Sequence, residues 1–373
     1  MQCNRRTFLL GSAACTASLL CHRSAWAAPA ADPELVWHDV TTWGVEGRGW
    51  ETLDRKRYFD RLPAKADGVV RPPVWSLSRH SAGMAVRFQT NARTIHVDYE
   101  LFSASLAMPH MPATGVSGLD LYGELSPGDE RWVQVVMPSA QTIKQALVSG
   151  LDGVLRTYTI YLPLYNGVNW LKIGVPADCE FQPLAPRTDK PLVFYGTSIM
   201  HGGCASRPGM AIPAILGRML DRPTINLGFS GNGTMDPEFV DLMAELDPAV
   251  YCIDCLPNMG PDTVRERARM LVEKLRAAHP QTPILLVEDR VFTNAPFIPE
   301  RQQFHKENHQ ALREAFDALT AAGVPQLYYL PGDELLGSDG EGAVDGSHPN
   351  DLGFLRNAEA YEKALRPILD GGK

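Results

Sequence analysis

The hydrophobic pattern changes near residue 190, and this change limits what the chain can fold into. Before it, apolar and polar residues alternate, as where Ile95, Val97 and Tyr99 are separated by single polar residues. That spacing is typical of half-buried strands. After it, short apolar runs alternate with longer segments of helical periodicity, as in a sheet covered by helices on both faces. The sequence therefore predicts an N-terminal β-sandwich followed by a three-layer α/β/α domain with a mainly parallel sheet.

The boundaries follow from the same pattern. At 373 residues the chain is too long for a single core to be the natural expectation. We predict a sandwich over residues 28–182, a proline-stiffened linker over 183–190 and an α/β domain over 191–373. Within the α/β domain, strands are expected at 192–195, 224–227, 249–256, 284–288 and 327–330, and helices at 210–220, 237–246, 263–278, 300–322 and 352–369.

The first of these strands leads into a candidate nucleophile. The apolar run Leu192–Tyr195 stops at Gly196 and is followed by a glycine-rich stretch, predicted as a loop, that contains Ser198. Ligands of open parallel sheets bind where loops leave the carboxyl ends of the strands. A serine there can attack a substrate, and a neighbouring backbone N–H can receive the negative charge that develops. Taken alone, the block is equally compatible with an ordinary turn serine.

A carboxylate and a histidine near the C-terminus supply the missing base. Asp345 precedes His348 by three residues in a predicted loop. At this spacing the carboxylate can hold the imidazole Nδ1–H and point Nε2 outward. Two more polar blocks, at 226–233 and 254–258, also follow apolar runs. We therefore expect all four blocks at strand ends, along one edge of the sheet.

With these four blocks in this order, the chain resembles the SGNH (GDSL-type) hydrolase superfamily of serine esterases over about residues 190–369. The resemblance implies a flavodoxin-like arrangement of the α/β domain. Thr197 stands where the Gly-Asp-Ser form of the family has aspartate. The resemblance also assigns the site: Ser198 as nucleophile, His348 and Asp345 as base and orienting carboxylate, and Ser198, Gly231 and Asn258 as the oxyanion hole.

A second motif lies in the predicted sandwich. Gly118-Leu-Asp-Leu-Tyr122 resembles the Gly-x-Asp-Leu-Tyr motif of a domain family found just before SGNH hydrolase domains. One interpretation places Asp120 or Tyr122 at the domain junction, where they shape the substrate cleft. The alternative is an ordinary strand with a satisfied polar pair. His201 and Arg207 follow Ser198 in the predicted crevice loop and are further candidate substrate contacts.

The resemblance implies a serine esterase that hydrolyses short acyl esters through an acyl-enzyme. Its two-domain form, together with an export signal, favours an acetyl ester of a carbohydrate, either a small molecule or a polysaccharide. Three alternatives remain open. An O-acyltransferase would use the same triad with a sugar hydroxyl in place of water, and a thioesterase or lysophospholipase would share the triad. A carbohydrate-binding protein with a decayed site would not be an enzyme. No metal or organic cofactor is expected.

The composition and the N-terminal residues indicate which partners the protein has and where in the cell it is located. The net charge of −8 and the lack of a Lys/Arg cluster argue against a nucleic-acid partner. Residues 1–27 contain Arg5-Arg6, an apolar stretch and a small-x-small end at Ala25–Ala27. They resemble a twin-arginine export signal, and the apolar stretch is shorter than the roughly 20 residues of a membrane span. We expect a periplasmic or secreted protein whose mature chain has no membrane anchor.

The cysteines and a pair of histidines are the remaining candidates for disulfide bonds or metal binding. Cys252 and Cys255 lie three apart in a predicted strand, so they should point to opposite faces as buried thiols. If any pair forms a disulfide, Cys204 with Cys255 is favoured. His305 and His309 share one helix face but have no third ligand nearby in the sequence, so they are predicted to be surface histidines. The sequence leaves the oligomeric state open.

Overall fold

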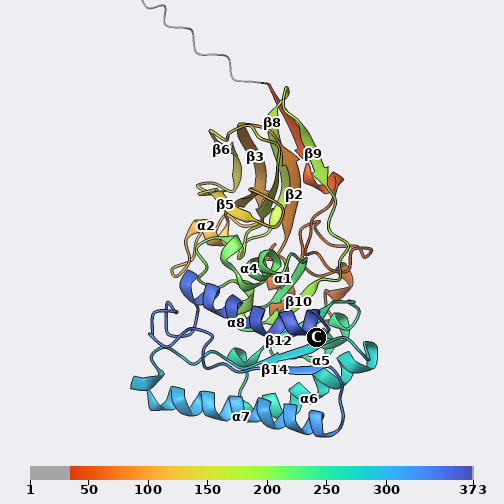
Figure 1. The fold of residues 1–373 in the computed structure, drawn as a ribbon, viewed down its shortest axis with the longest axis vertical. Coiled ribbons are helices and arrows are strands. Elements are labelled where there is room, and N and C mark those ends of the chain that lie inside the picture. Colours follow the sequence, from red (N-terminus) through yellow and green to blue (C-terminus); the bar gives the residue numbers. More distant parts are fainter. Residues whose placement is uncertain (1–33, 372–373) are drawn as a thin grey trace, which may run out of the picture. The chain divides into compact units, whose positions relative to one another are not determined.

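The computed structural model describes residues 34–371, and the export signal predicted at 1–27 lies outside them. From Leu35 onward the chain forms one compact unit. Its N-terminal part is rich in antiparallel strands, and its C-terminal part is an α/β domain (Figure 1). The predicted fold class is therefore confirmed. Within the described residues, no helix combines the length and the apolar character needed to cross a membrane.

Two antiparallel sheets form the sandwich. On β3, residues Ile95, Val97 and Tyr99 are fully buried while their neighbours are only partly covered, as the alternating pattern predicts. They pack with residues of the facing sheet, including Phe88 and Ile160, in one core. One sheet has the order β1 (Leu35–Asp39), β8 (Val168–Pro176), β3 (Thr94–Leu101), β6 (Thr142–Ser149). The other has the order β5 (Glu130–Val135), β4 (Asp120–Glu124), β7 (Arg156–Tyr161), β2 (Ala85–Thr90), β9 (Phe181–Leu184).

The C-terminal sheet has five strands, all paired in parallel. Their order is β11 (Thr224–Gly228), β10 (Leu192–Gly196), β12 (Val250–Asp254), β13 (Ile284–Val287), β14 (Leu327–Leu330). This is the flavodoxin-like order 2-1-3-4-5. Because the chain leaves β10 toward one neighbour and later returns to its other side, a crevice opens at the carboxyl end of β10. The sheet order thus creates a binding site at that point.

Helices cover both faces of this sheet (Figure 1). Alternate residues of β10 serve the two cores, with Phe194 on one face and Val193 and Tyr195 on the other. On the Phe194 face lie α3 (Ser198–His201), α4 (Ile212–Met219) and α8 (Asp351–Leu369). On the Val193 face lie α5 (Pro237–Met243), α6 (Pro261–Ala278) and α7 (Pro299–Ala321). Burial on both faces explains why these strands are continuous apolar runs.

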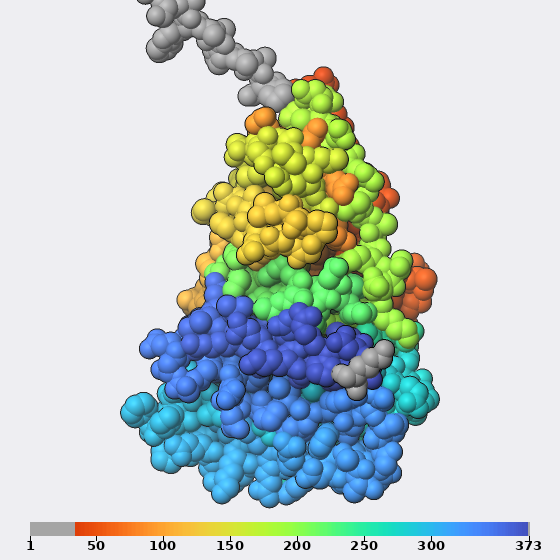
Figure 2. Space-filling model, in the orientation of Figure 1, coloured from red at the N-terminus to blue at the C-terminus, as the bar shows by residue number. Residues whose placement is uncertain are grey.

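Part of the predicted sandwich packs into the α/β domain instead. Residues 50–78, which contain η2 (Ala64–Ala66) and α1 (Pro72–Ser78), place Trp50, Leu62 and Val74 in the core on the Val193 face. No sequence pattern indicated that this segment packs against the α/β domain, because its helices are only one or two turns long. In Figure 2 the yellow surface of the sandwich meets the green surface of residues near 200. Between the two parts, Thr114 Oγ1 donates to the carbonyl of Ser206 over 2.6 Å.

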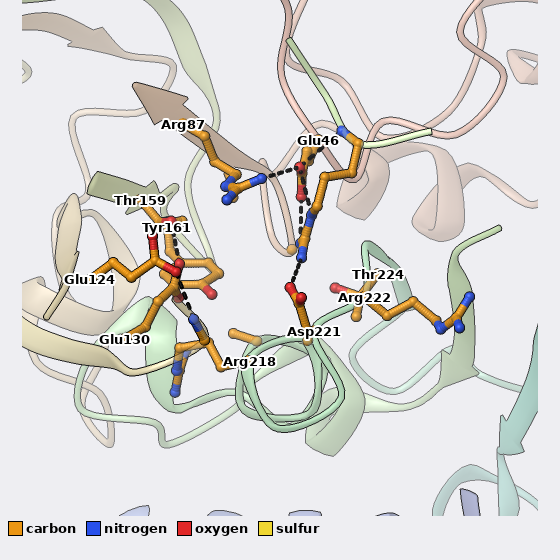
Figure 3. Close-up of a pocket in the computed structure, with 16 residues that line it drawn as sticks. Glu46, Arg87, Glu124, Glu130, Thr159, Tyr161, Arg218, Asp221, Arg222 and Thr224 are labelled. Carbon is orange, nitrogen blue, oxygen red and sulfur yellow. Dashed lines mark hydrogen bonds and ion pairs between the residues drawn. The ribbon is translucent and has the colours of Figure 1, made fainter. Parts of the chain in front are cut away.

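The linker is held on both sides. Pro183 and Leu184, predicted as its first residues, still belong to β9, which pairs with β2. Arg187 donates to both carboxylate oxygens of Glu46 and, over 2.9 Å, to Asp221. Figure 3 shows Glu46 and Asp221 facing one another across this junction. Arg187 therefore ties the strand-rich part to the α/β domain.

The four cysteines within the described residues are free thiols. Cys252 and Cys255 are fully buried and lie on opposite faces of the parallel sheet, as predicted. Cys204 lies on the Phe194 face, whereas Cys255 lies on the Val193 face. The favoured pairing of Cys204 with Cys255 is therefore wrong, because the sheet separates the two sulfur atoms.

Candidate active site

Ser198 is the first residue of α3, directly beyond the end of β10. A glycine-rich loop was predicted here, and the structure instead has a short helix that Thr197 caps by accepting from the Ile199 N–H over 3.3 Å. The helix lies against β11, where a Cβ on Gly228 would come within 2.1 Å of the His201 backbone nitrogen. A glycine at 228 is therefore required for the helix that presents Ser198.

Ser198, His348 and Asp345 form a continuous hydrogen-bonded chain. Ser198 Oγ lies 2.8 Å from His348 Nε2, and His348 Nδ1 lies 2.7 Å from Asp345 Oδ2. The other carboxylate oxygen accepts from the backbone N–H groups of His348 and Ser347. Burial opposes ionisation of Asp345, but the hydrogen bonds from His348 and Ser347 outweigh it and lower the pKa of the carboxyl. The arrangement joins a hydroxyl to a base and the base to an anionic orienting group.

Gly231 and Asn258 lie on either side of this chain in the sheet order. Gly231 follows β11 and Asn258 ends η4 (Leu256–Asn258) after β12, and these strands flank β10. The position of a Cβ on Gly231 is open space, so a substrate atom can approach its backbone. Asn258 Oδ1 accepts from the Gly233 N–H over 3.2 Å, which leaves the Asn258 amide NH₂ as the donor. Both can present donors to an oxyanion near Ser198.

Arg71, at the start of α1, holds the loop that carries Gly231. Its guanidinium donates to Asn232 Oδ1 over 2.9 Å, to Thr234 Oγ1 over 2.9 Å and to Asp236 Oδ2 over 2.8 Å. Sequence reasoning missed this role because 161 residues separate Arg71 from Asn232. An arginine from the N-terminal part thus fixes a loop of the candidate oxyanion hole.

Comparisons with known proteins show the family to which a chain with this fold belongs. The model of the GDSL-like lipase/acylhydrolase family matches residues 189–366, and that of the N-terminal domain of SGNH-type esterases, named for its GxDLY motif, matches 35–181. A protein from Bacteroides ovatus, described as a GDSL-like lipase, has 32% sequence identity. The match covers 90% of this chain and 98% of that one, with a TM-score of 0.85. The chain belongs to the GDSL-like lipase/acylhydrolase family.

More distant structures share the fold of this GDSL-like hydrolase. A salicylyl-acyltransferase from a tetracycline biosynthetic pathway is 18% identical, with a TM-score of 0.69, over 91% of this chain and 96% of that one. A family two carbohydrate esterase from Cellvibrio japonicus is 12% identical, with a TM-score of 0.58, over 91% of this chain and 99% of that one. A search of curated protein sequences found no match.

His201 does not face the crevice of this hydrolase. It is fully buried, its Nε2 lies 2.7 Å from the carbonyl of Leu164, and its ring stacks on Tyr165 at 4.2 Å between centroids. Burial, together with the nearby charge of Arg61, holds the pKa of His201 well below its usual range. The interpretation of His201 as a substrate contact is therefore wrong. Its partner Tyr165, which the sequence did not single out, places its hydroxyl 3.4 Å from the carbonyl oxygen of Ser198.

Asp120, Tyr122 and Arg207 bind one another, so they are not exposed substrate contacts. Asp120 is fully buried and accepts from Arg207 over 3.0 Å, from the Gly209 N–H over 2.8 Å and from the indole of Trp132 over 3.0 Å. Arg207 also donates to the Tyr122 hydroxyl. Burial raises the pKa of Asp120, and Arg207 opposes that rise. The motif does lie at the junction, but as a satisfied polar cluster that fastens the segment after Ser198.

The two helix histidines are also placed differently from the prediction. His305 is buried, and its Nε2 accepts from the Phe292 N–H over 3.0 Å. His309 is half-buried beside the carbonyl of Asp289, at 2.9 Å. Their assignment as surface histidines is wrong because the loop after β13 covers them. No group of three or more His, Cys, Asp or Glu side chains in residues 34–371 is arranged to hold a metal ion.

A small polar cavity lies at the junction, and none of the predicted catalytic residues lines it. Figure 3 shows Glu46, Arg87, Glu130 and Arg218 around it. The charged groups largely satisfy one another: Glu46 binds Arg187, and Glu130 accepts from Thr159 Oγ1 over 2.7 Å. This cavity belongs to the interface between the two parts and not to the candidate active site.

Proposed function

We propose that this GDSL-like hydrolase is a serine esterase that removes short acyl groups, most simply acetyl, from a carbohydrate. The observation that carries the proposal is the chain of contacts from Ser198 Oγ through His348 to Asp345, with distances of 2.8 and 2.7 Å. Carbohydrate esterases among the proteins that share its fold support the substrate class. The twin-arginine pattern at Arg5-Arg6 supports an exported protein that meets such esters outside the cytoplasm.

The proposed reaction has two acyl-transfer steps. His348 Nε2 takes the proton from Ser198 as Oγ attacks the ester carbonyl, and the carbonyl oxygen becomes an oxyanion. The N–H groups of Ser198 and Gly231 and the Asn258 amide donate to that oxygen. His348 then gives its proton to the departing alcohol, which leaves an acetyl group on Ser198. Water, deprotonated by His348, attacks the acyl-enzyme, and His348 then returns that proton to Ser198 Oγ as the bond to the acyl carbon breaks and acetate leaves. Asp345 stabilises the imidazolium in both steps.

The test combines a substrate panel with one substitution. Wild-type protein should release acetate from acetylated saccharides, and Ser198→Ala should lower turnover by about 10³-fold or more with the fold intact. Circular dichroism and the thermal unfolding midpoint check the fold. Product analysis with an added sugar acceptor separates hydrolysis from acyl transfer. Near-wild-type turnover in folded Ser198→Ala would refute the assignment of the nucleophile.

A further inference from the structure

A loop of the strand-rich part is anchored in the core of the catalytic domain. The turn Met108–Met111, between β3 and β4, is closed by two backbone hydrogen bonds of 3.0 Å each. Met111 is 2% exposed and belongs to the same core as Phe194 and Ile199, the residue after the candidate nucleophile. Met108 packs against that core as well. The turn is thereby fixed relative to the crevice.

The tip of this turn carries an exposed histidine beside the candidate base. The ring centroid of His110 lies 6.4 Å from that of His348, and the two planes are inclined by 45°. His110 is 238 positions before His348 in the chain, which is 348 minus 110. Nothing in the local sequence around His110 resembles a catalytic block, and only the anchored turn brings it to the site. The strand-rich part therefore supplies a polar ring to the rim of the catalytic crevice.

The mechanism indicates which portion of an ester meets His110. The carbonyl oxygen must turn toward the donors of Ser198, Gly231 and Asn258. The alcohol oxygen must lie near His348 Nε2, because that nitrogen returns the proton to the departing alcohol. An exposed group beside the His348 ring, such as His110, can therefore contact the alcohol portion of the substrate.

We propose that His110 is a specificity-determining residue that binds a hydroxyl of the alcohol portion of the ester. This inference rests on the proposed esterase function. A neutral imidazole offers one hydrogen-bond donor and one acceptor, a combination that complements the hydroxyl groups of a polyhydroxylated alcohol. An aryl leaving group has no such hydroxyl and gains nothing from the contact. His110 thus selects sugar esters over simple esters that carry the same acyl group.

The experiment compares two acetates that differ only in the alcohol. For His110→Ala, kcat/KM on a mono-O-acetylated methyl glucoside should fall by about tenfold, the value of one good hydrogen bond to substrate. On 4-nitrophenyl acetate it should stay within about twofold of wild type, since no contact is lost there. His110→Gln, which keeps a donor and an acceptor, should recover part of the loss. Pro109→Ala, in the same exposed turn, is the matched control and should leave both substrates unaffected.

Every remaining outcome of these assays would contradict the proposal, each in a different way. Unchanged kinetics on both acetates in His110→Ala would show that His110 does not contact the alcohol. Equal losses on both would assign it to positioning His348 instead. A wild-type protein that cleaves the aryl acetate but no sugar acetate would overturn the assignment of a polyhydroxylated alcohol to the substrate. It would leave the assignment as an esterase intact. A wild-type protein that cleaves neither ester would refute the proposed function itself, and this inference with it.

Discussion

Asp289, just beyond the end of β13, carries a carboxyl group that is buried without a side-chain hydrogen-bond donor among the described residues. It is fully buried, and neither carboxylate oxygen accepts a hydrogen bond from another side chain. Burial, with a smaller contribution from the Asp254 carboxylate, raises the pKa of Asp289 to about 7, although Arg290 opposes the rise. The Nδ1 of His305 lies 3.7 Å from Asp289 Oδ2. His305 is neutral, because its Nε2 accepts from Phe292 and burial lowers its pKa to about 4.

This carboxyl should give folding stability a distinctive pH dependence. Between an unfolded pKa of about 4 and the folded pKa of about 7, the folded state keeps a proton that the unfolded state has released. The contribution of Asp289 to the free energy of unfolding is therefore fully present below about pH 4 and is lost as the pH rises to about 7.

Asp289→Asn should remove this dependence. Relative to wild type, the free energy of unfolding of the variant should increase by up to roughly 4 kcal/mol between pH 4 and pH 8, since three pKa units correspond to about that value. Urea unfolding of both proteins across this range measures the difference between their curves. If the new amide changes the free energy of unfolding by the same amount at every pH, that change does not affect the difference in slope between the two curves. Parallel curves would mean that Asp289 is ionised throughout.

The segment between β14 and α8 carries both Asp345 and His348, and contacts with the segment after β13 hold it. Gly346 lies between the two catalytic candidates with φ at +94°, and its carbonyl accepts from the Thr293 N–H over 2.9 Å. A Cβ at this position would lie 2.9 Å from both Arg301 Nη1 and the Asn294 amide. A side chain at this position would displace the ends of the Arg301 and Asn294 side chains, which pack against the segment that carries the candidate base.

Gly346→Ala should reduce turnover by about tenfold or more, because small displacements of a catalytic group are costly. Gly340→Ala is the matched control, since Gly340 is in the same segment, has φ at +82°, and a Cβ added there would meet no atom within 4 Å. Both variants acquire the same backbone strain, and only Gly346→Ala acquires the clash. Assays on an aryl acetate and thermal unfolding of both variants provide the measurement. Equal activity in the two variants would show that the packing at Gly346 does not position His348.

At the scale of the whole molecule, the two parts share their cores. Trp50, Leu62 and Val74 from the N-terminal part complete the core on one face of the parallel sheet, and Met111 and Leu164 complete the other. Arg61, which is 1% exposed, donates to the carbonyls of Asn226 and Gly228 on β11. The strand-rich part is therefore a structural component of the catalytic domain and not an independently attached module.

A chain that begins at Arg187 should consequently fail to fold cooperatively. Each large apolar side chain removed from these cores contributes about 1.5–3 kcal/mol, and a domain has only about 5–15 kcal/mol of net stability. A chain beginning at Glu34 is the control, and it should unfold cooperatively. Soluble yield, near-ultraviolet circular dichroism and thermal unfolding distinguish the two. A monomeric Arg187 chain with a sharp unfolding transition would contradict the shared-core interpretation.

The sequence by itself determined the fold class and which short blocks carry the candidate chemistry. Hydrophobic period is a local property, so the alternation around Ile95 and the apolar run Leu192–Tyr195 identified strands of two kinds. The blocks around Ser198 and His348 were recognisable because residue type and spacing within a few positions make them distinctive. Their positions after apolar runs predicted that they lie at strand ends.

Only the tertiary structure decided burial and long-range partners. His201 and Asp120 were candidate substrate contacts because polar residues near a crevice are usually exposed, yet each is buried and hydrogen-bonded to distant groups. Arg71 and His110 carried no local signal, because their roles depend on contacts with Asn232 and His348 more than 150 positions away. A side chain's local sequence fixes its chemistry, but its partners and solvent exposure arise from how distant segments pack together.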